Sequence, residues 1–303
     1  MSSDTPLCRT MFAAEGFSIS IIRGDAARGF EDFTFPIFRE KLFLNEKDPR
    51  FVGLGLKFGD APCGLALAEY TAPLGWRLVS LFVEEPFRNE GLGGALVDAM
   101  ESEVRERGGS RLGTVYRTTI PEREAFERVL ARQGWSPPSL RMMVLEAEFN
   151  RISQSPFLTE SPVLDPGFEL VPWHEVPREE IEHLGKRGFS VRIWPLNYSD
   201  DYHRPTSFGL RWRGELCGWL VNHLHSPGFL RFTSSYLVDE LQGKGQFAAV
   251  MAESVRRMPA AGMHRGIWTV PVEFRRMIAF SKRRLAPYCE SVTQTYGSFK
   301  KLN

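Results

Sequence analysis

The residues best suited to chemistry lie in one short turn. It consists of Arg88, Asn89, Glu90, Gly91, Leu92, Gly93 and Gly94. An apolar segment, residues 77–83, precedes the turn, and an amphipathic segment, residues 91–107, continues from it. The start of a helix has unpaired N–H groups and a partial positive charge, and glycines let a ligand approach the main chain closely. The segment therefore predicts an anion-binding turn suited to a pyrophosphate.

Hydrophobic periodicity predicts the elements that position this turn. Apolar and alternating segments predict strands at residues 17–22, 51–58, 63–71, 77–83, 111–116 and 140–149. Helical spacing predicts helices at residues 31–44, 91–107 and 121–133, the first interrupted at Pro36. The predicted order is β, α, β, β, β, α, β, α, β.

An internal repeat extends this pattern to the second half of the chain. Cys63 and Cys217 lie in similar turns and are separated by 154 residues (217 − 63). The same offset pairs Pro73 with Pro227, Arg77 with Arg231, Ser80 with Ser234, Gly91 with Gly245, Ala95 with Ala249, Arg111 with Arg265, Ala125 with Ala279 and Phe126 with Phe280. The sequence pattern of the second half predicts strands at residues 168–172, 207–213, 217–225, 230–238, 266–270 and 290–302. It predicts helices at residues 176–188, 243–258 and 272–285. Two copies of one fold are expected, the alternative being a single large α/β domain with coincidental matches.

The domain boundaries follow from the repeat and from a change in composition. Residues 153–166 are rich in proline and serine, as linkers are. We therefore expect an N-terminal domain at 1–152, a linker at 153–166 and a C-terminal domain at 167–303.

The turn at 88–94 resembles motif A of the GNAT (N-acetyltransferase) superfamily, (Gln/Arg)-x-x-Gly-x-(Gly/Ala). Arg88, Gly91 and Gly93 fill its fixed places, and Gln133-Gly134-Trp135 resembles a later family segment, so the resemblance covers residues 17–149. It implies an α/β (α+β GNAT) fold with two tandem copies, each a central mixed, mostly antiparallel sheet flanked by helices. It also implies that amides from Asn89 to Gly94 hold the pyrophosphate of coenzyme A, and that the main chain of Leu81, Phe82 and Val83 pairs with the pantetheine arm. The turn lacks the Gly-Lys-Ser/Thr ending of a P-loop, and it also lacks the GxGxxG motif of a Rossmann fold.

The equivalent turn of the second copy departs from the motif. Gln242 and Gly245 fit, but Phe247 replaces the small residue. We expect this copy to bind coenzyme A poorly or not at all, the alternative being a different donor.

Candidate acid–base groups are few. Leu130 stands where many family members have the tyrosine that protonates the departing thiolate. Tyr116 is the substitute candidate, with packing as the alternative role. Glu69 and Glu84 are candidate bases for the acceptor amine, or solvated surface charges.

The second copy contributes a polar set on two neighbouring strands. His223 and His225 alternate on one strand face, and Ser234 and Tyr236 lie on the next strand. They are candidate acceptor-binding residues or a proton relay, the alternative being partly exposed histidines near a hairpin. No third ligand accompanies the two histidines, so we expect no metal site.

The resemblance implies an acyltransferase that moves an acyl group, acetyl foremost, from acetyl-CoA or another acyl-CoA to an amine of a small-molecule or amino-acid-like acceptor by direct attack. One alternative is an aminoacyl transferase that uses aminoacyl-tRNA. Basic residues of one predicted helix suit that partner, although a solvated face also explains them: Arg275, Arg276, Lys282, Arg283 and Arg284. The other alternative is a non-catalytic ligand-binding regulator.

Composition excludes several other classes. The 303 residues carry a formal net charge of +1, which argues against a dedicated DNA-binding protein. No apolar run is long enough to span a bilayer, and the first residues lack a secretion signal. The four cysteines, far apart and without a CxxC pair, favour a reducing compartment. We expect a cytoplasmic monomer or homodimer with no membrane partner.

Overall fold

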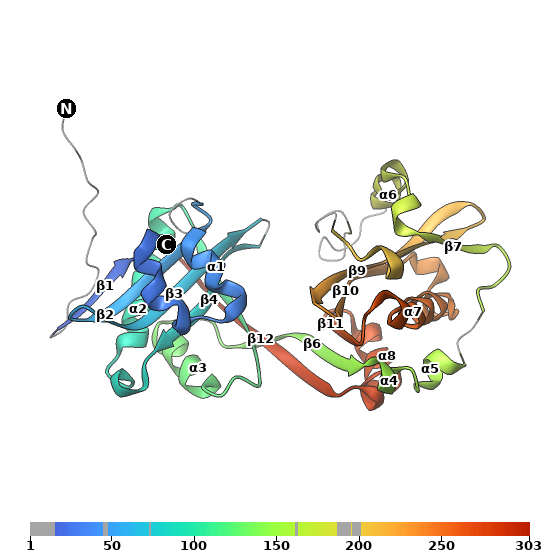
Figure 1. The fold of residues 1–303 in the computed structure, drawn as a ribbon. Coiled ribbons are helices and arrows are strands. Elements are labelled where there is room, and N and C mark those ends of the chain that lie inside the picture. The colour runs from blue at the N-terminus through green and yellow to red at the C-terminus, as the bar shows by residue number, and fades with distance from the viewer. Residues whose placement is uncertain (1–15, 45–47, 73, 161–162, 187–194, 196–200) are drawn as a thin grey trace. The chain divides into compact units, whose positions relative to one another are not determined.

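The chain folds into two compact units. The computed structural model describes residues 16–44, 48–72, 74–160, 163–186, 195 and 201–303. Unit 1 comprises Met1–Arg141 and Thr295–Asn303, and unit 2 comprises Met142–Gln294. Each unit is a mixed α/β structure whose sheet is flanked by helices (Figure 1). The predicted fold class is confirmed.

The sheet of unit 1 has the strand order β1-β2-β3-β4-β5-β12. Its neighbours are antiparallel except for β4 and β5, which are parallel. The strands are β1 (Phe17–Ile21), β2 (Phe51–Phe58), β3 (Ala61–Thr71), β4 (Gly75–Val83), β5 (Arg111–Arg117) and β12 (Ser291–Lys301). The helices are η1 (Gly24–Phe33), α1 (Pro36–Leu44), η2 (Glu85–Phe87), α2 (Leu92–Glu106) and α3 (Arg123–Arg132).

Side-chain alternation along β3 divides the core of unit 1 between two faces. Ala66 and Ala68 join the cluster that contains the buried residues of α2. Leu65 and Leu67 join a second cluster, with residues of η1 and α1. Because successive strand residues point to opposite faces, the sheet has α2 on one side and η1 with α1 on the other.

The sheet of unit 2 has the order β6-β11-β10-β9-β8-β7, in which β10 and β11 are parallel. Its strands are β6 (Ser139–Glu148), β7 (Phe168–Pro172), β8 (Phe208–Trp212), β9 (Glu215–Ser226), β10 (Phe229–Leu237) and β11 (Arg265–Pro271). Its helices are α4 (Phe149–Ile152), α5 (Pro156–Thr159), η3 (Trp173–Glu175), α6 (Arg178–Gly185), η6 (Arg204–Thr206), η7 (Asp239–Leu241), α7 (Gln246–Arg257), η8 (Pro259–Ala261), α8 (Arg275–Arg284) and η9 (Ala286–Tyr288). The predicted helix at 176–188 ends in residues 187 and 188, which lie outside the described residues.

The two units exchange their last strands, so they differ from the expected domains 1–152 and 167–303. Residues of β12 pair with β5 of unit 1, from Thr295 with Arg117 to Lys301 with Arg111. Residues of β6 pair with β11 of unit 2, from Met142 with Pro271 to Glu148 with Arg265. Local periodicity identifies a strand but not its partner, which is why the sequence did not reveal this exchange.

The segment expected to be a linker, residues 153–166, includes a packed helix. Within it, α5 contributes the buried Leu158 to the core of unit 2. Ser155, before α5, is buried and donates a hydrogen bond from Oγ to Arg284 O (2.9 Å). Residues 161 and 162 lie outside the described residues. The described part of the segment containing Ser155 and Leu158 therefore belongs to a folded unit.

Matching hydrogen bonds confirm the repeat. Cys63 Sγ donates to Leu56 O (3.6 Å), and Cys217 Sγ donates to Leu210 O (3.3 Å). Each cysteine carbonyl in turn accepts a bond of 2.9 Å, from Glu84 N in unit 1 and from Val238 N in unit 2. All these pairs keep the offset of 154.

The offset fails at the last helix of each copy. The starts of α3 and α8 differ by 152 residues (275 − 123), and their buried residues Leu130 and Ser281 differ by 151 (281 − 130). The connection before α8 spans residues 272–274, whereas the one before α3 spans 118–122. The matches of Ala125 with Ala279 and of Phe126 with Phe280 are therefore wrong.

A buried carboxylate on α2 anchors the exchanged strand β12, which yields a stability prediction. Glu101 accepts hydrogen bonds from Lys300 Nζ (2.5 Å) and Trp135 Nε1 (2.8 Å). Lys300→Met leaves this carboxylate short of a partner, so we expect a loss of about 1–3 kcal/mol in the free energy of unfolding. Lys301→Met changes the exposed lysine that follows Lys300, so it should change the free energy of unfolding by less than about 0.5 kcal/mol. Chemical denaturation checks both values, and equal effects of the two substitutions would contradict this role.

Candidate functional site

Strand β4 separates from β5 partway along its length. The two parallel strands pair at Trp76 with Leu112 and at Arg77 with Gly113. Beyond Arg77, Val79 is an extra residue in the pairing with β3, because Leu67 pairs with Ser80 and Ala68 with Leu78. Such a bulge bends a strand and redirects it.

The separation leaves one edge of β4 open at Leu81, Phe82 and Val83. These residues pair with Ala66, Leu65 and Gly64 of β3, whereas the described pairs of β4 with β5 end at Arg77. Backbone groups directed toward β5 can then hydrogen-bond to a ligand. This is the place where the sequence predicts the pantetheine arm.

The turn after β4 has the backbone expected of an anion site. Arg88 Nε donates to Val83 O (2.9 Å) and so ties the turn to the strand. Asn89 has a φ of 69°, and Gly91, the N-cap of α2, has a φ of 79°. Gly91 O accepts from Ala95 N (3.0 Å). The amides of Leu92, Gly93 and Gly94 precede that bond, so they have no acceptor within the helix.

The glycines of the turn leave space around these amides. A Cβ at Gly91 would meet nothing within 4 Å. A Cβ at Gly93 would lie 3.6 Å from Val129 of α3, and one at Gly94 would lie 2.7 Å from Gln133 Nε2. Helix α3 thus passes close to the start of α2, and larger residues would narrow the space between them.

The second copy keeps the backbone of this turn but fills it differently. Gln242 Nε2 donates to Leu237 O (2.7 Å), as Arg88 does to Val83, and Gly245 has a φ of 85°. The buried Gln246 accepts a bond from Asp165 N (3.1 Å). Phe247, in the place of Gly93, packs against the core of unit 2. The position that has no side chain in unit 1, Gly93, therefore carries an aromatic ring in unit 2.

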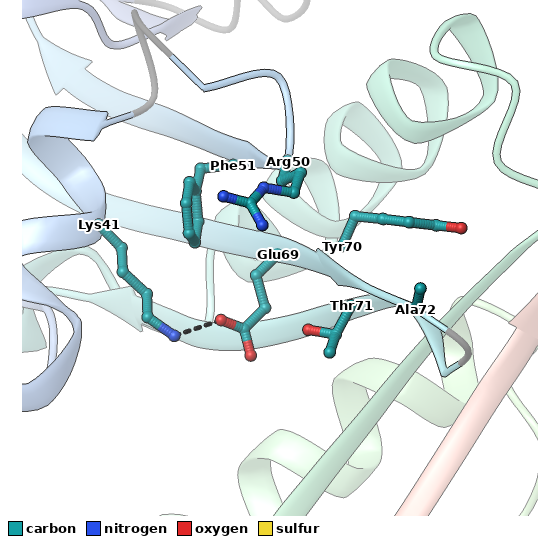
Figure 2. Close-up of a pocket in the computed structure, with 7 residues that line it drawn as sticks. All are labelled: Lys41, Arg50, Phe51, Glu69, Tyr70, Thr71 and Ala72. Atoms are coloured by element: carbon teal, nitrogen blue, oxygen red, sulfur yellow. Dashed lines mark hydrogen bonds and ion pairs between the residues drawn. The ribbon is translucent and has the colours of Figure 1, made fainter. Parts of the chain in front are cut away.

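Glu69, a candidate base, lies in a buried ion-pair cluster. It stands opposite Arg77 across β3 and β4, and its carboxylate accepts a hydrogen bond from Arg77 Nη2. The carboxylate also accepts one from Lys41 Nζ of α1 (Figure 2). Burial acts to raise the pKa of Glu69, but the hydrogen bonds and charges of Lys41 and Arg77 hold it below its ordinary value. A carboxylate bound in this way is a poor proton acceptor, because binding a proton would weaken both ion pairs.

A pocket of about 450 Å³ opens beside this cluster. Its walls come from α1, β2, β3 and their connections, and its lining residues are Lys41, Arg50, Phe51, Glu69, Tyr70, Thr71 and Ala72 (Figure 2). Lys41 and Arg77 were not predicted as partners of Glu69. The hairpin spacing of Glu69 and Arg77 was a signal for one contact, whereas the contact with Lys41 depends on how α1 packs.

Tyr116, the candidate proton donor, is buried beneath α3. Its hydroxyl donates to Glu127 Oε1 (2.8 Å), and its ring packs edge-on against Phe126. Burial, followed by the hydrogen bond and charge of Glu127, raises the pKa of Tyr116 well above its usual range. These contacts fit the packing alternative and make the phenol a weak acid. Leu130, the position where family members have a tyrosine, is buried in the core.

Glu84 lies at the end of β4, next to the predicted donor turn. Glu84 is half-buried, and its backbone N–H donates a hydrogen bond to Cys63 O (2.9 Å). Burial, together with the charge of Glu84, raises the pKa of Cys63 to about 11, so this cysteine remains a thiol at neutral pH. Glu84 is thus the candidate base nearest the turn in sequence.

The polar residues predicted to bind the acceptor in the second copy have separate environments. His223 Nδ1 lies 3.0 Å from Thr233 Oγ1, whereas the exposed His225 packs its ring against Phe229. Ser234 is buried and accepts a hydrogen bond from Trp219 Nε1 (2.8 Å). The ring of Tyr236 packs on that of Trp219, 5.1 Å between centroids. The contacts of Ser234 and Tyr236 are those of core residues.

Three further features concern ligands and partners. Within the described residues, no three or more His, Cys, Asp or Glu side chains are grouped so that they could hold a metal ion. No described helix is long and apolar enough to cross a membrane. The basic residues predicted on α8 are all exposed, whereas on α3 Arg123 pairs with Glu127 (3.7 Å) and Arg128 with Glu124 (3.9 Å).

Comparison with known proteins agrees with this geometry. Residues 20–135, which contain the turn, match the Acetyltransferase (GNAT) family. No curated protein matches the sequence significantly.

Solved structures of GNAT proteins match both units. A tandem GNAT protein from the clavulanic acid biosynthesis pathway has a TM-score of 0.66 and 13% identity, covering 95% of this chain and 99% of that one. A GCN5-related N-acetyltransferase from Sphaerobacter thermophilus has a TM-score of 0.65 and 14% identity, covering 96% and 98%. A GCN5-related glucosamine N-acetyltransferase region of a fungal multi-domain GH3 beta-N-acetylglucosaminidase has a TM-score of 0.69 and 13% identity, covering 95% and 38%. The chain has the fold of a tandem GNAT protein, and its residues 20–135 match the model of the Acetyltransferase (GNAT) family.

Proposed function

We propose that the protein transfers an acyl group, acetyl foremost, from acyl-CoA to an amine of a small acceptor, and that unit 1 binds the donor. One observation carries the proposal. The amides of Leu92, Gly93 and Gly94 precede the first hydrogen bond of α2, and the N-cap Gly91 leaves the space beside them open. Backbone N–H groups at a helix start are suited to a pyrophosphate.

The open edge of β4 supports the same placement of the donor. The pyrophosphate would bind at the turn, with the pantetheine arm along Leu81, Phe82 and Val83. The thioester would then lie toward the bulge at Val79, where β4 leaves β5. The turn, the open edge and the bulge follow one another along a single segment of chain, so one local geometry positions the whole donor.

The proposed reaction is a direct acyl transfer. The neutral acceptor amine attacks the thioester carbonyl carbon, the C–N bond forms, and the C–S bond breaks. The amine nitrogen loses a proton, and the departing thiolate gains one. Glu84 is our candidate base that accepts the proton of the amine, directly or through water, because Glu69 is bound by Lys41 and Arg77. We assign protonation of the thiolate to solvent, since Tyr116 is bound to Glu127.

A second candidate function is aminoacyl transfer from aminoacyl-tRNA, and the basic face of α8 favours it. Arg275, Arg276, Lys282 and Arg283 are exposed at helical spacing on that face. Salt-dependent retention of tRNA, lost when Lys282 and Arg283 are changed to glutamine, would favour this candidate. Retention of acetyl-CoA without tRNA binding favours the first proposal, and acetyl-CoA binding without turnover favours a ligand-binding regulator.

A bulky residue at the helix cap should block the donor. Gly91→Trp places a side chain in the open space beside the amides, so we expect acetyl-CoA binding to weaken at least tenfold, or about 1.4 kcal/mol. Gly108→Trp is the matched control, because Gly108 has a φ of 77°, compared with 79° for Gly91, and also has nothing near its Cβ position. Calorimetric titration with acetyl-CoA measures both. Equal weakening by the two substitutions would show that backbone strain, and not blocking, is responsible.

The environment of Tyr116 yields a second prediction. If solvent protonates the thiolate, Tyr116→Phe should retain kcat within about threefold of wild type, whereas loss of a general acid typically costs about 10²–10⁴-fold. Single-turnover acetyl transfer measures the step without product release. A hundredfold loss in a variant that keeps its melting temperature would restore Tyr116 as the acid.

A further inference from the structure

We propose that the pocket lined by Lys41, Phe51, Glu69 and Tyr70 binds the acceptor through a carboxylate, so that the acceptor is an amino acid or a related amino carboxylic acid. The inference rests on the proposed acyl transfer and names its acceptor class. Four observations support it: the charge of the cluster beside the pocket, the place of Arg77 on β4, and the size and the walls of the pocket.

The charged groups that line the pocket or bind its Glu69 carry an excess of positive charge. Lys41 and Arg77 flank the single carboxylate of Glu69. The charge of Arg50 is balanced by that of Asp48, whose carboxylate accepts three hydrogen bonds of 2.6–3.1 Å from the Arg50 guanidinium. The cluster of Lys41, Glu69 and Arg77 thus has a net charge of +1, and an anionic ligand would neutralise it.

Hydrogen-bond donors are also in excess. A lysine has three N–H donors and an arginine five, whereas Glu69 offers two oxygens. Among the described residues, the buried Arg77 Nε–H has no acceptor. The side chains of Lys41 and Arg77 are 28% and 35% exposed, and Lys41 lines the pocket itself, next to Glu69, which binds Arg77. A ligand carboxylate suits such donors because charge-assisted hydrogen bonds are strong.

The register of β4 places this cluster at the closed end of the separation from β5. Arg77 is the last residue of β4 in the described pairing with β5. Leu81, where the open edge begins, lies four residues further on, roughly 13 Å along an extended strand. The thioester position proposed near Val79 lies between these two residues, so an acceptor bound near Arg77 would lie beyond the end of the pantetheine arm.

The pocket also opens on the face of the sheet away from α2. Leu65, Leu67 and Glu69 point to the same face of β3. Leu65 and Leu67 pack with η1 and α1, and Glu69 contacts Lys41 of α1. The donor turn leads into α2, which packs on the opposite face. Donor and acceptor would therefore reach the opening between β4 and β5 from different sides, without competing for space.

The dimensions and walls of the pocket fit a small zwitterion. Its volume, about 450 Å³, lies in the lower part of the range for small-molecule sites. Phe51 and the exposed Tyr70 supply aromatic surface, with Lys41 Nζ 5.7 Å from the Phe51 ring centre. The cluster would hold the carboxylate, and the aromatic residues would contact the side chain of the acceptor.

Matched acceptors test the inference. Acetyl-CoA-dependent release of coenzyme A is measured with each common amino acid and with the amine that its decarboxylation gives, for example phenylalanine and phenethylamine. We expect kcat/KM to be at least tenfold higher for the best amino acid than for its amine. Lys41→Met should remove most of that preference by raising KM for the amino acid, with little change for the amine. Lys57→Met changes a lysine of β2 that does not line the pocket, so this variant should keep the preference for the amino acid over its amine.

A second variant guards against misfolding of Lys41→Met. Thr71 is an exposed residue of the pocket wall, so Thr71→Glu adds a negative charge without removing a buried partner. It should lower kcat/KM for the amino acid at least fivefold and not for the amine.

The outcomes separate this inference from the proposed function. Absence of acetyl-CoA binding would overturn the proposed function itself. If acetyl-CoA binds but no amino acid is acetylated, or the amines react as well as the acids, the acceptor class is wrong while the donor site stands. Equal effects of Thr71→Glu on both members of a pair would likewise contradict a carboxylate site.

Discussion

The separation of β4 from β5 is the constraint on which the rest of unit 1 depends. Parallel neighbours ordinarily continue their hydrogen bonds, but here the described pairing ends at Arg77, and the bulge at Val79 redirects the strand. The separation exposes one edge of β4 and leads into the turn that starts α2. A continuous β4–β5 pair would use these backbone groups internally, and no edge would remain for a ligand.

The second copy shows which parts of this arrangement belong to the fold and which to the ligand. Thr233 is the extra residue of β10, between Phe232 and Ser234, and β10 pairs with β11 from Phe229 to Phe232. The bulge, the left-handed glycine and the side-chain tie to the preceding strand are therefore common to both copies. The small residues beside the helix start are not, since Phe247 packs against the core. Keeping the backbone without the small residues is what we expect of a copy retained for structure.

The sequence predicted the elements well because their signals are local. Alternation, helical spacing and glycine turns predicted nearly every strand and helix, and the paired cysteines predicted the repeat. Three features depended on contacts distant in sequence and were not predicted. The strands β6 and β12 exchange units, Glu69 is held by Lys41 as well as Arg77, and Tyr116 donates to Glu127. Glu69 and Tyr116 have residue types suited to acid–base chemistry, but their partners give them other roles.

The central claim is that donor binding uses the backbone of the first turn and not that of the second. Amide chemical shifts measured during a titration with acetyl-CoA test it directly. If the first turn binds the donor, the largest changes will occur at Leu92, Gly93 and Gly94, with smaller changes at Leu81 to Val83 and none at Gln246 and Phe247. Changes centred on Gln246 and Phe247, or no changes in either turn at saturating acetyl-CoA, would contradict it.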